Sequence, residues 1–571
     1  MKNKILTFVA ATAMLSATTS CIKEILPQNS TVTIDQVTEA PGAYENAVNA
    51  ITATLTGEFV YGGNSNTYLY DIGLPGFYIM RDLMGQDMVY PYQNWFTYWY
   101  TAQYLGPSYR FSQLPWTYYY GWIKSCNEVI TMAGEDPADD QKIGLGIAYA
   151  MRAYYYQDLA RLYAQKPYAL SLNDPVTSVS VPIVDENTTL EDLAHNPRAT
   201  NEVMWAFILS DLDKAEQYLA NYQRKDVYTP DLSVVYGLKA RAYQWMEDWA
   251  NAEKYAKLAQ NGYTVMSAAE YTDWNTGFNT PNGAWMFGLT YKSDDPQILL
   301  NDADSSWGSN MCIEINPYVS GCGYAANYGQ PFLIDRHLYE TIPATDCRKQ
   351  CYIDFTIDEN YDLTDEDGVP TPEALEALSA YTNHPDWLVI TGTAVQGYEK
   401  VGGLPLKFRT AGGEAGRDNQ YIGFVVAVPM MRVEEMKLIE AEAAGMQGDV
   451  NRGIQLLTEF AKTRDADYVY GKHNEAYYNN ATSAFQNEIW WQRRIEFWGE
   501  GLATYDIKRL QKGIIRSYAG TNHTELYRYN SETTPEWMNY CIVQTETNYN
   551  LDCTNNPDPS MPNGDSPEFV W

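Results

Sequence analysis

The chain has 571 residues, enough for several domains or for one large helical assembly, and a hydrophobic content of 45% provides for a substantial core. Its net charge of −33 argues against a nucleic-acid partner, because basic side chains must neutralise phosphates there. The 48 Tyr and 16 Trp stand against only 16 Phe, and Tyr and Trp suit wet binding surfaces as well as interiors.

The N-terminus has the pattern of a secretory signal. Lysines precede an apolar stretch over residues 5–17, which is too short to span a bilayer, and small residues then lead to Cys21. A cysteine in this position is typical of a bacterial lipoprotein signal. We therefore expect a signal peptide over residues 1–20, lipidation of Cys21 and a polar tether over residues 21–40. The alternative is an ordinary cleaved signal that leaves Cys21 free.

The sequence pattern of residues 41–262 predicts a helical scaffold. Apolar residues recur at helical spacing in the segments 116–134 and 142–165, which we expect to form an antiparallel pair. A further amphipathic helix is predicted over residues 198–222, with Thr200 at its start.

An internal repeat links two distant parts of the chain. Residues 238–255 align without gaps on residues 439–456, and Asp248 matches Asp449. The pattern resembles tetratricopeptide repeats, in which small residues let helix pairs approach closely. Because one such pair cannot bury its apolar face alone, several pairs must pack together.

A large insert separates the two copies. Residues 263–427 are rich in Gly, Asn, Asp, Pro and aromatic residues and have little helical period. This predicts irregular loops with short strands or helices and little strand overall. Residues 428–571 then predict C-terminal helix pairs and an irregular tail. Loops on a rigid helical frame are where binding residues usually lie, so we expect the insert to form part of a binding face.

The cysteines and acids do not indicate a catalytic or metal site. Cys312 with Cys322, and Cys541 with Cys553, are close enough in sequence for disulfides, but structural or free cysteine is the favoured interpretation. No HExxH, GxSxG or Walker motif is present in the sequence. With 72 acidic residues, the sequence is also compatible with a pair of carboxylates that catalyses glycoside hydrolysis.

Calcium is a second open question. A metal site from Asp302, Asp304 or the acidic run 362–368 is conceivable, although solvated loop acids are the favoured interpretation.

Aromatic residues crowd the segment 85–111, which lacks a helical pattern. A pyranose ring presents a C–H face that stacks on a flat aromatic ring, while polar neighbours bind its hydroxyls. The segment therefore favours sugar binding, although peptides also lie on Tyr-rich surfaces and several rings should pack into the core. The aromatic residues are Tyr90, Tyr92, Trp95, Phe96, Tyr98, Trp99, Tyr100, Tyr104 and Tyr109.

Together these segments resemble the SusD/RagB family of outer-membrane lipoproteins of Bacteroidetes, in the right order along nearly the whole chain. Five motifs carry the resemblance. They are "WTYYYGWIKSCNEVI" through Trp116, Tyr120, Ile123 and Asn127; "AYAMRAYYYQDLARLYA" through Arg152, Ala153 and Leu159; "RATNEVMWAFILSDLDKAEQYL" over residues 198–219; "MMRVEEMKLIEAEAAGMQGD" through Arg432, Glu435, Leu438, Ala441, Glu442 and Ala443; and "WWQRRIEFWGEGLATYDIKRLQKG" through Arg493, Arg494, Glu496, Glu500, Gly501, Asp506 and Arg509.

The resemblance implies a mainly α fold, with tetratricopeptide-like helix pairs forming a right-handed helical scaffold. It implies a non-enzymatic, lipid-anchored protein at the cell surface of the outer membrane, which binds oligosaccharide or polysaccharide and delivers it to a SusC-like TonB-dependent barrel transporter. A peptide ligand in the same transport role is the alternative, and a helical glycoside hydrolase is a less favoured one. No cofactor is implied, although family members can carry calcium.

By position, the resemblance implies one wall of the site after Asp87 and another in the insert. The expected ligand contacts are Arg81, Asp87, Tyr92, Asn94, Trp95 and Tyr98 from the first wall, and Trp274, Trp307, Asn310 and Tyr324 from the second. We expect Arg494, Glu496 and Glu500 to form a buried ion network that stabilises the last helix pair.

Overall fold

The computed structural model describes residues 42–57, 70–92, 95–174, 178–319, 322–474, 482–561 and 564–571. The predicted signal peptide, the lipidation site Cys21, the tether and Asn94 lie outside the described residues. Residues 1–46 and 47–571 form two separate units, and the description that follows concerns the second.

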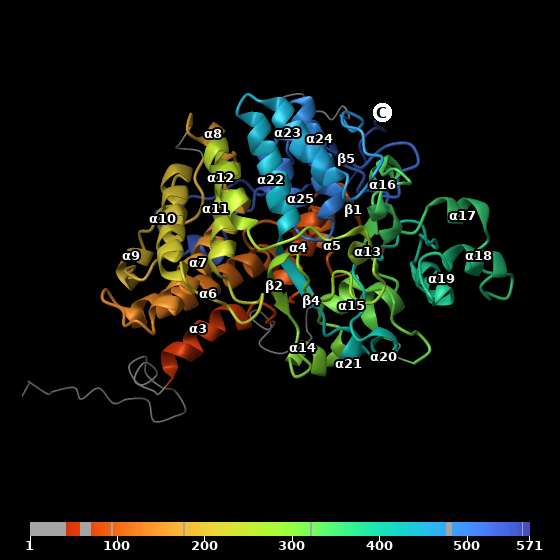
Figure 1. Ribbon diagram of the computed structural model, residues 1–571, viewed down its shortest axis with the longest axis horizontal. Coiled ribbons are helices and arrows are strands. Elements are labelled where there is room, and N and C mark those ends of the chain that lie inside the picture. Colours follow the sequence, from red (N-terminus) through yellow and green to blue (C-terminus); the bar gives the residue numbers. More distant parts are fainter. Residues whose placement is uncertain are drawn as a thin grey trace, which may run out of the picture. The chain divides into compact units, whose positions relative to one another are not determined.

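Helix pairs form the scaffold, as the sequence predicts. Helices α6 (Arg110–Ala133) and α7 (Lys142–Tyr163) pack against each other, and α10 (Asn201–Leu219) packs against α7 (Figure 1). The predicted start of α10 is confirmed, because the Thr200 hydroxyl accepts a backbone N–H of the first turn at 3.3 Å.

The two repeat copies form equivalent helix hairpins. The first is α11 (Leu232–Met246) with α12 (Trp249–Ala259), and the second is α22 (Val433–Met446) with α23 (Val450–Ala461). Asp248 and its match Asp449 are the N-caps of α12 and α23, and each accepts the backbone N–H three residues on at 3.2 Å. Helix α12 packs against α22, so copies that are far apart in sequence stack side by side (Figure 1).

Small residues let the second hairpin close tightly. A Cβ atom on Gly453 of α23 would lie 2.7 Å from the Cα atom of Gly445 in α22 and 2.6 Å from the Phe485 ring. The core of this region joins α22, α23 and α24 (Ala484–Glu496). Each fully buried Leu or Phe there contributes about 1.5–3 kcal/mol.

The insert leaves and rejoins the scaffold through a short antiparallel sheet. Strand β2 (Trp285–Thr290) pairs with β4 (Ala427–Arg432), and both are almost wholly buried. A second pair joins the aromatic segment to the insert, because β1 (Met88–Val89) pairs with β3 (Leu333–Ile334). The third sheet of the described residues pairs β5 (Ile514–Ile515) with β6 (Asn530–Ser531).

The insert is loop-rich, as predicted, and short helices make up most of its regular secondary structure. They are α13 (Ala268–Tyr271), α14 (Pro296–Leu299), α15 (Trp307–Met311), α16 (Arg336–Thr341), α17 (Thr356–Asn360), α18 (Pro372–Leu378), α19 (Pro385–Ala394), α20 (Gly413–Arg417) and α21 (Gln420–Gly423), with the 3-10 turns η1 (Asn301–Ala303) and η3 (Cys347–Cys351) and the π-helical turn η2 (Gly323–Asn327).

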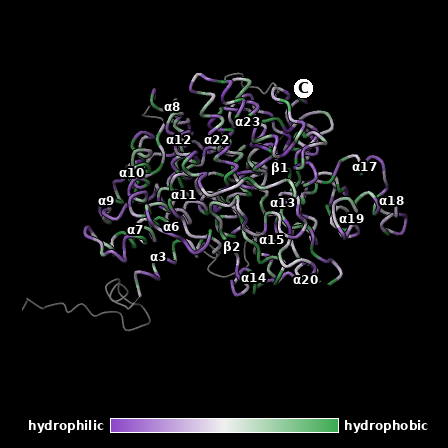
Figure 2. The backbone as a smooth tube through the Cα atoms, viewed as in Figure 1, coloured by the Kyte–Doolittle hydropathy of each residue, from purple (hydrophilic) through white to green (hydrophobic). Residues whose placement is uncertain are grey.

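Outside the insert the structure also has shorter elements. They are α3 (Ala43–Ala53), α4 (Leu74–Leu83), α5 (Thr97–Tyr100), α8 (Tyr168–Ser171), α9 (Leu190–Leu193), α25 (Ala503–Arg509), α26 (Gln544–Thr547) and the 3-10 turn η4 (Glu536–Met538). Hydrophilic and hydrophobic residues are interspersed along the chain (Figure 2). Within the described residues, no helix combines the length and the apolar character that a membrane span needs.

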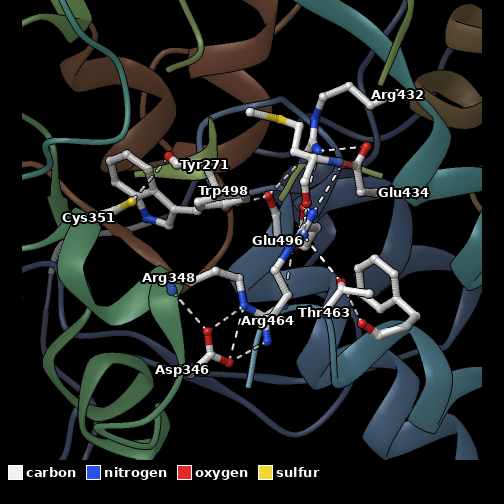
Figure 3. Close-up of polar contacts among 12 residues, drawn as sticks. Tyr271, Asp346, Arg348, Cys351, Arg432, Glu434, Thr463, Arg464, Glu496 and Trp498 are labelled. Atoms are coloured by element: carbon white, nitrogen blue, oxygen red, sulfur yellow. Dashed lines mark hydrogen bonds and ion pairs between the residues drawn. The ribbon is translucent and has the colours of Figure 1, made fainter. Parts of the chain in front are cut away.

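The predicted ion network is confirmed for Glu496 and Glu500, which share Arg432, whereas Arg494 pairs with Asp87 instead. The network centres on Glu496, whose side chain is fully buried (Figure 3). Its carboxylate lies 3.2 Å from Arg348 of η3, 3.1 Å from Arg432 at the end of β4 and 3.0 Å from Arg464 after α23. Burial alone would raise the pKa of Glu496, but these arginines hold it well below its ordinary value. One carboxylate thus joins the insert, the β2–β4 sheet and the second hairpin.

Candidate functional site

Aromatic rings from two distant segments meet in a continuous series, which we call the aromatic chain. Its first half runs from the insert to the aromatic segment: the Tyr328 and Tyr324 ring centroids lie 5.0 Å apart, Tyr324 and Trp95 6.4 Å, and Trp95 and Tyr70 6.5 Å. Trp95 and Tyr324 cross at 90°. Both are only partly buried and Tyr328 is 43% exposed, so this half opens to solvent.

The second half of the aromatic chain continues from buried Tyr70 through Phe111, which stacks on Tyr98 at 3.6 Å. Tyr98 contacts Tyr104, and Tyr104 contacts Tyr109 at 5.2 Å. Tyr104 and Tyr109 are 49% and 41% exposed. The buried rings in the middle therefore support exposed rings at both ends, and the exposed rings offer flat faces for an apolar surface.

Local hydrogen bonds fix the position of Tyr324. The backbone N–H of Tyr324 donates to the Ser309 hydroxyl at 3.0 Å, and the N–H of Gly323 donates to the Asp304 carboxylate at 3.0 Å. Ser309 also donates to Asp304, at 3.2 Å. Burial raises the pKa of Asp304 to about 6, although the bonds from Gly323 and Ser309 favour its charged form.

The turn before Asp304 is strained. Asn301, Asp302 and Ala303 all have left-handed φ angles, of 47°, 55° and 61°. Each residue other than glycine costs about 1–2 kcal/mol in this conformation, and such strain concentrates at functional sites. The turn places Asp302 where its carboxylate accepts a hydrogen bond of 3.1 Å from the hydroxyl of Tyr421, which is itself 40% exposed.

The arrangement combines stacking faces with polar groups. Its rings meet at different angles, and the Asp302 carboxylate and the Tyr421 hydroxyl add hydrogen-bonding groups in the same insert as Tyr324 and Tyr328. This combination of stacking faces and a few polar groups is typical of ligand sites.

Comparison with known proteins agrees with this architecture. Residues 82–244 match the family model SusD-like_3, described as starch-binding associating with outer membrane. A SusD-like carbohydrate binding protein from Bacteroides vulgatus has a similar structure, with a TM-score of 0.65 and 22% identity over 90% of this chain and 97% of that one. This chain has a SusD-like fold.

Two other solved structures share the SusD-like fold. A putative sugar binding protein from Bacteroides vulgatus has a TM-score of 0.63 and 18% identity, over 91% of this chain and 99% of that one. Surface glycan-binding protein A from Bacteroides thetaiotaomicron, in complex with laminarihexaose, has a TM-score of 0.59 and 18% identity, over 91% of this chain and 98% of that one. No curated protein matches the chain.

Four residues expected to contact the ligand lie inside the SusD-like framework, which corrects that expectation. Arg81 is 2% exposed and pairs with Asp158 at 2.9 Å, and Asp87 pairs with Arg494 at 2.5 Å. Trp307 and Asn310 are 1% and 4% exposed. Trp307 packs on the Phe408 ring, and Asn310 donates to the carbonyl oxygen of Ser306 at 2.9 Å.

The remaining residues divide between the aromatic chain and other places. Trp95, Tyr98 and Tyr324 belong to it, so the structure does bring the two predicted walls together there. Trp274 is half-buried against the guanidinium of Arg409, 5.9 Å from its ring centroid. Tyr92 is half-buried, and Asn94 lies outside the described residues.

Sequence reasoning missed Tyr328 and Tyr421. The aromatic content of "GYAANYG" is the one signal that points to Tyr328, four residues after Tyr324. Nothing in the sequence brings Tyr421 to Asp302, because 119 positions separate them.

The other open questions on cysteines and metal have structural answers. Cys312, Cys541 and Cys553 are free, buried thiols, so neither possible disulfide forms. In the acidic run 362–368, Asp365 accepts the backbone N–H groups of Asp367 and Val369 and closes its own turn. Among the described residues, no three His, Cys, Asp or Glu side chains group to hold a metal ion.

Proposed function

We propose that this SusD-like chain binds oligosaccharide or polysaccharide along the aromatic chain and does not cleave it. The observation that carries the proposal is the contact between Trp95 and Tyr324, 6.4 Å apart and perpendicular, which joins the two sequence-predicted walls into one partly exposed surface. Two rings at a right angle match a glycan whose successive sugar rings turn relative to each other, and nearby polar groups can bind hydroxyls.

The proposal is supported by what similar proteins bind. The matched family model is described as starch-binding, and one structural neighbour is in complex with laminarihexaose. These are properties of those proteins, but the shared fold and the local chemistry of this surface agree with the same ligand class here.

We further propose that the chain is anchored at the outer-membrane surface by a lipid on Cys21 and delivers its ligand to a SusC-like TonB-dependent transporter. The lipoprotein pattern before Cys21 and the outer-membrane description of the matched family support this role. Co-purification from membranes tests it: a barrel transporter should accompany the chain, and a chain recovered alone under mild detergent would contradict delivery.

Calorimetric titration of a glycan panel tests the binding function. The panel contains laminarihexaose, maltohexaose, neutral oligosaccharides of the other common linkages and acidic oligosaccharides. At least one of them should bind with micromolar to millimolar affinity. Peptides of similar length form the second arm, because a peptide ligand is the surviving alternative in the same transport role. Binding to peptides alone would replace the glycan proposal.

A reducing-end assay on the same mixtures separates binding from hydrolysis. No new reducing ends should appear during prolonged incubation of the bound glycan. Their release, and its loss when a facing carboxylate pair is mutated, would show a glycoside hydrolase instead.

A further inference from the structure

A second polar cavity lies beside the aromatic segment and takes no part in the site described above. It has a volume of about 460 Å³, within the range of small-ligand sites. It is lined by Pro91, by Arg336, Phe355, Asp358, Glu359, Gly397, Tyr398 and Lys400 of the insert, and by residues 520–525 and Arg528 of the C-terminal part. Pro91 precedes Trp95 by four residues, a chain length that spans at most about 14 Å. One extended ligand can therefore reach both places.

Two cations of this cavity, Lys400 and Arg528, are available to bind an anionic group. Within the described part of the chain, neither Lys400 nor Arg528 lies in an ion pair. Lys400 is exposed, and Arg528 donates only through its Nε, at 2.8 Å to the carbonyl oxygen of His523. Its two Nη groups thus retain the donors that bind a carboxylate in the bidentate arrangement.

The orientation of Arg528 is fixed by its hydrogen bond to the backbone of a buried residue. The carbonyl that accepts its Nε belongs to His523, which is 1% exposed. The His523 ring lies 2.9 Å from the hydroxyl of Tyr100 and 3.0 Å from the carbonyl oxygen of Gln86. Because this anchor is rigid, little conformational freedom is lost when a ligand binds the guanidinium.

Most acids of the cavity are already occupied. Glu359 pairs with Arg336 at 2.6 Å, and the carboxylate of Asp358 accepts the backbone N–H groups of residues 401 and 402 at 2.9 and 2.8 Å. Among the described lining residues, Glu525 is the acid without such a partner. The lining carries three cations, Arg336, Lys400 and Arg528, and three acids, Asp358, Glu359 and Glu525, so its formal charges balance. Arg336 is paired with Glu359, which leaves Lys400 and Arg528 as the lining cations outside an ion pair among the described residues.

We propose that this cavity binds the carboxylate of an acidic sugar in the glycan, with Arg528 and Lys400 as the recognising cations. The half-buried ring of Tyr398 lines the same cavity, and its hydroxyl is held by the carbonyl oxygen of Gly402 at 2.7 Å, so the ring offers a fixed face to the sugar. The inference rests on the proposed glycan-binding function and narrows the ligand to a polymer that contains uronic acids.

Titration with matched acidic and neutral ligands tests the proposal. Six-residue oligomers of galacturonate, of mannuronate and of hyaluronan are each compared with their methyl esters, which keep the backbone but lose the charge. At least one acidic form should bind ten-fold or more tightly than its ester, and added salt should reduce the difference. Arg528→Gln and Lys400→Gln should each reduce that preference, whereas Glu525→Gln should increase it.

Lys225→Gln provides the charge-matched control, because Lys225 is exposed and does not line the cavity. It should leave both affinities unchanged, and thermal melts should show that all four variants are folded. Equal affinity for every acid and its ester would overturn the inference, as would an unchanged preference in Arg528→Gln. Neutral glycan binding that depends on Trp95 would then still support the proposed function, whereas no binding of any glycan would overturn both.

Discussion

Glu496 is one carboxylate shared by three buried arginines, and its removal should have a large effect on stability. Glu496→Gln leaves Arg348, Arg432 and Arg464 short of their counter-charge inside the protein. Breaking a buried pair in this way costs about 3–5 kcal/mol. The free energy of unfolding, from denaturant titration at pH 7, should fall by that amount.

The acid dependence of Glu496→Gln has a definite sign. Because the folded-state pKa of Glu496 lies below its ordinary value of 4.5, its contribution is complete above pH 4.5 and is lost as the pH falls. The stabilities of wild type and variant should therefore converge in acid. Glu459→Gln, on the exposed face of α23, is the control and should change stability by less than about 0.5 kcal/mol. A Glu496→Gln variant as stable as wild type at pH 7 would contradict this account.

Asp304 should show the opposite pH dependence. Burial raises its folded-state pKa from 3.8 to about 6, so the folded state binds the proton more tightly and loses stability as the pH rises through this window. Asp304→Asn keeps an acceptor for Gly323 and Ser309 but does not titrate. The variant should gain up to about 3 kcal/mol relative to wild type between pH 3.5 and 7.

Unfolding titrations at several pH values measure this difference. Asp367→Asn, an exposed acid in the acidic run, provides the control and should show no comparable gain. A difference between wild type and Asp304→Asn that is constant with pH would show that the Asp304 carboxyl does not titrate with a raised pKa.

At the residue scale, the sequence reveals residue type but not burial. Arg81 and Asp87 have the right chemistry for a sugar site, yet their charges are neutralised inside the protein by Asp158 and Arg494. Their partners are 77 and 407 positions away, so local sequence could not separate a framework pair from a ligand contact. Trp95 was predictable because its segment holds more aromatic residues than one short stretch can bury.

At the element scale, the matched N-caps give a prediction that tests the repeat itself. Asp248→Ala and Asp449→Ala each remove the acceptor of one backbone N–H at the start of equivalent helices. Each should cost about 1 kcal/mol in the free energy of unfolding. The double variant tests whether the hairpins α11–α12 and α22–α23, which stack through α12 and α22, are energetically coupled.

The control for these variants is Asp226→Ala, because the Asp226 carboxylate also accepts a backbone N–H, that of Tyr228, but in a turn outside the helices. It should cost less than either cap. If only Asp248→Ala lowered the free energy of unfolding, the two matched N-caps would not contribute equally to stability.

Helices and their hairpins were predictable, whereas the insert was not. Helical period and small residues in register identify α11, α12, α22 and α23 from the sequence. The insert instead depends on long-range pairing: β2 meets β4 at the opposite end of the insert, and β1 meets β3. These pairs have two to six residues per strand, too few for a reliable pattern of alternation.

At the scale of the whole molecule, framework and binding surface are separate. The motif at residues 490–513, the most specific in the sequence, supplies buried ion pairs: Arg494 binds Asp87, Arg493 binds Asp506, and Glu496 binds three arginines. The aromatic chain is built from other segments. The resemblance to a family therefore predicted the fold, whereas the proposed ligand surface depends on the three-dimensional contacts of Trp95, Tyr324 and Tyr328.

Paired measurements of the dissociation constant and the melting temperature, on Trp95→Ala and Arg494→Ala with the best glycan of the panel, test this separation most directly. Trp95→Ala should weaken binding ten-fold or more, about 1.4 kcal/mol, with a small change in Tm. Arg494→Ala leaves Asp87 buried without its partner, so it should lower Tm by several degrees while the remaining folded protein binds normally. Unchanged affinity in Trp95→Ala, or lost affinity in a fully stable Arg494→Ala, would contradict the account.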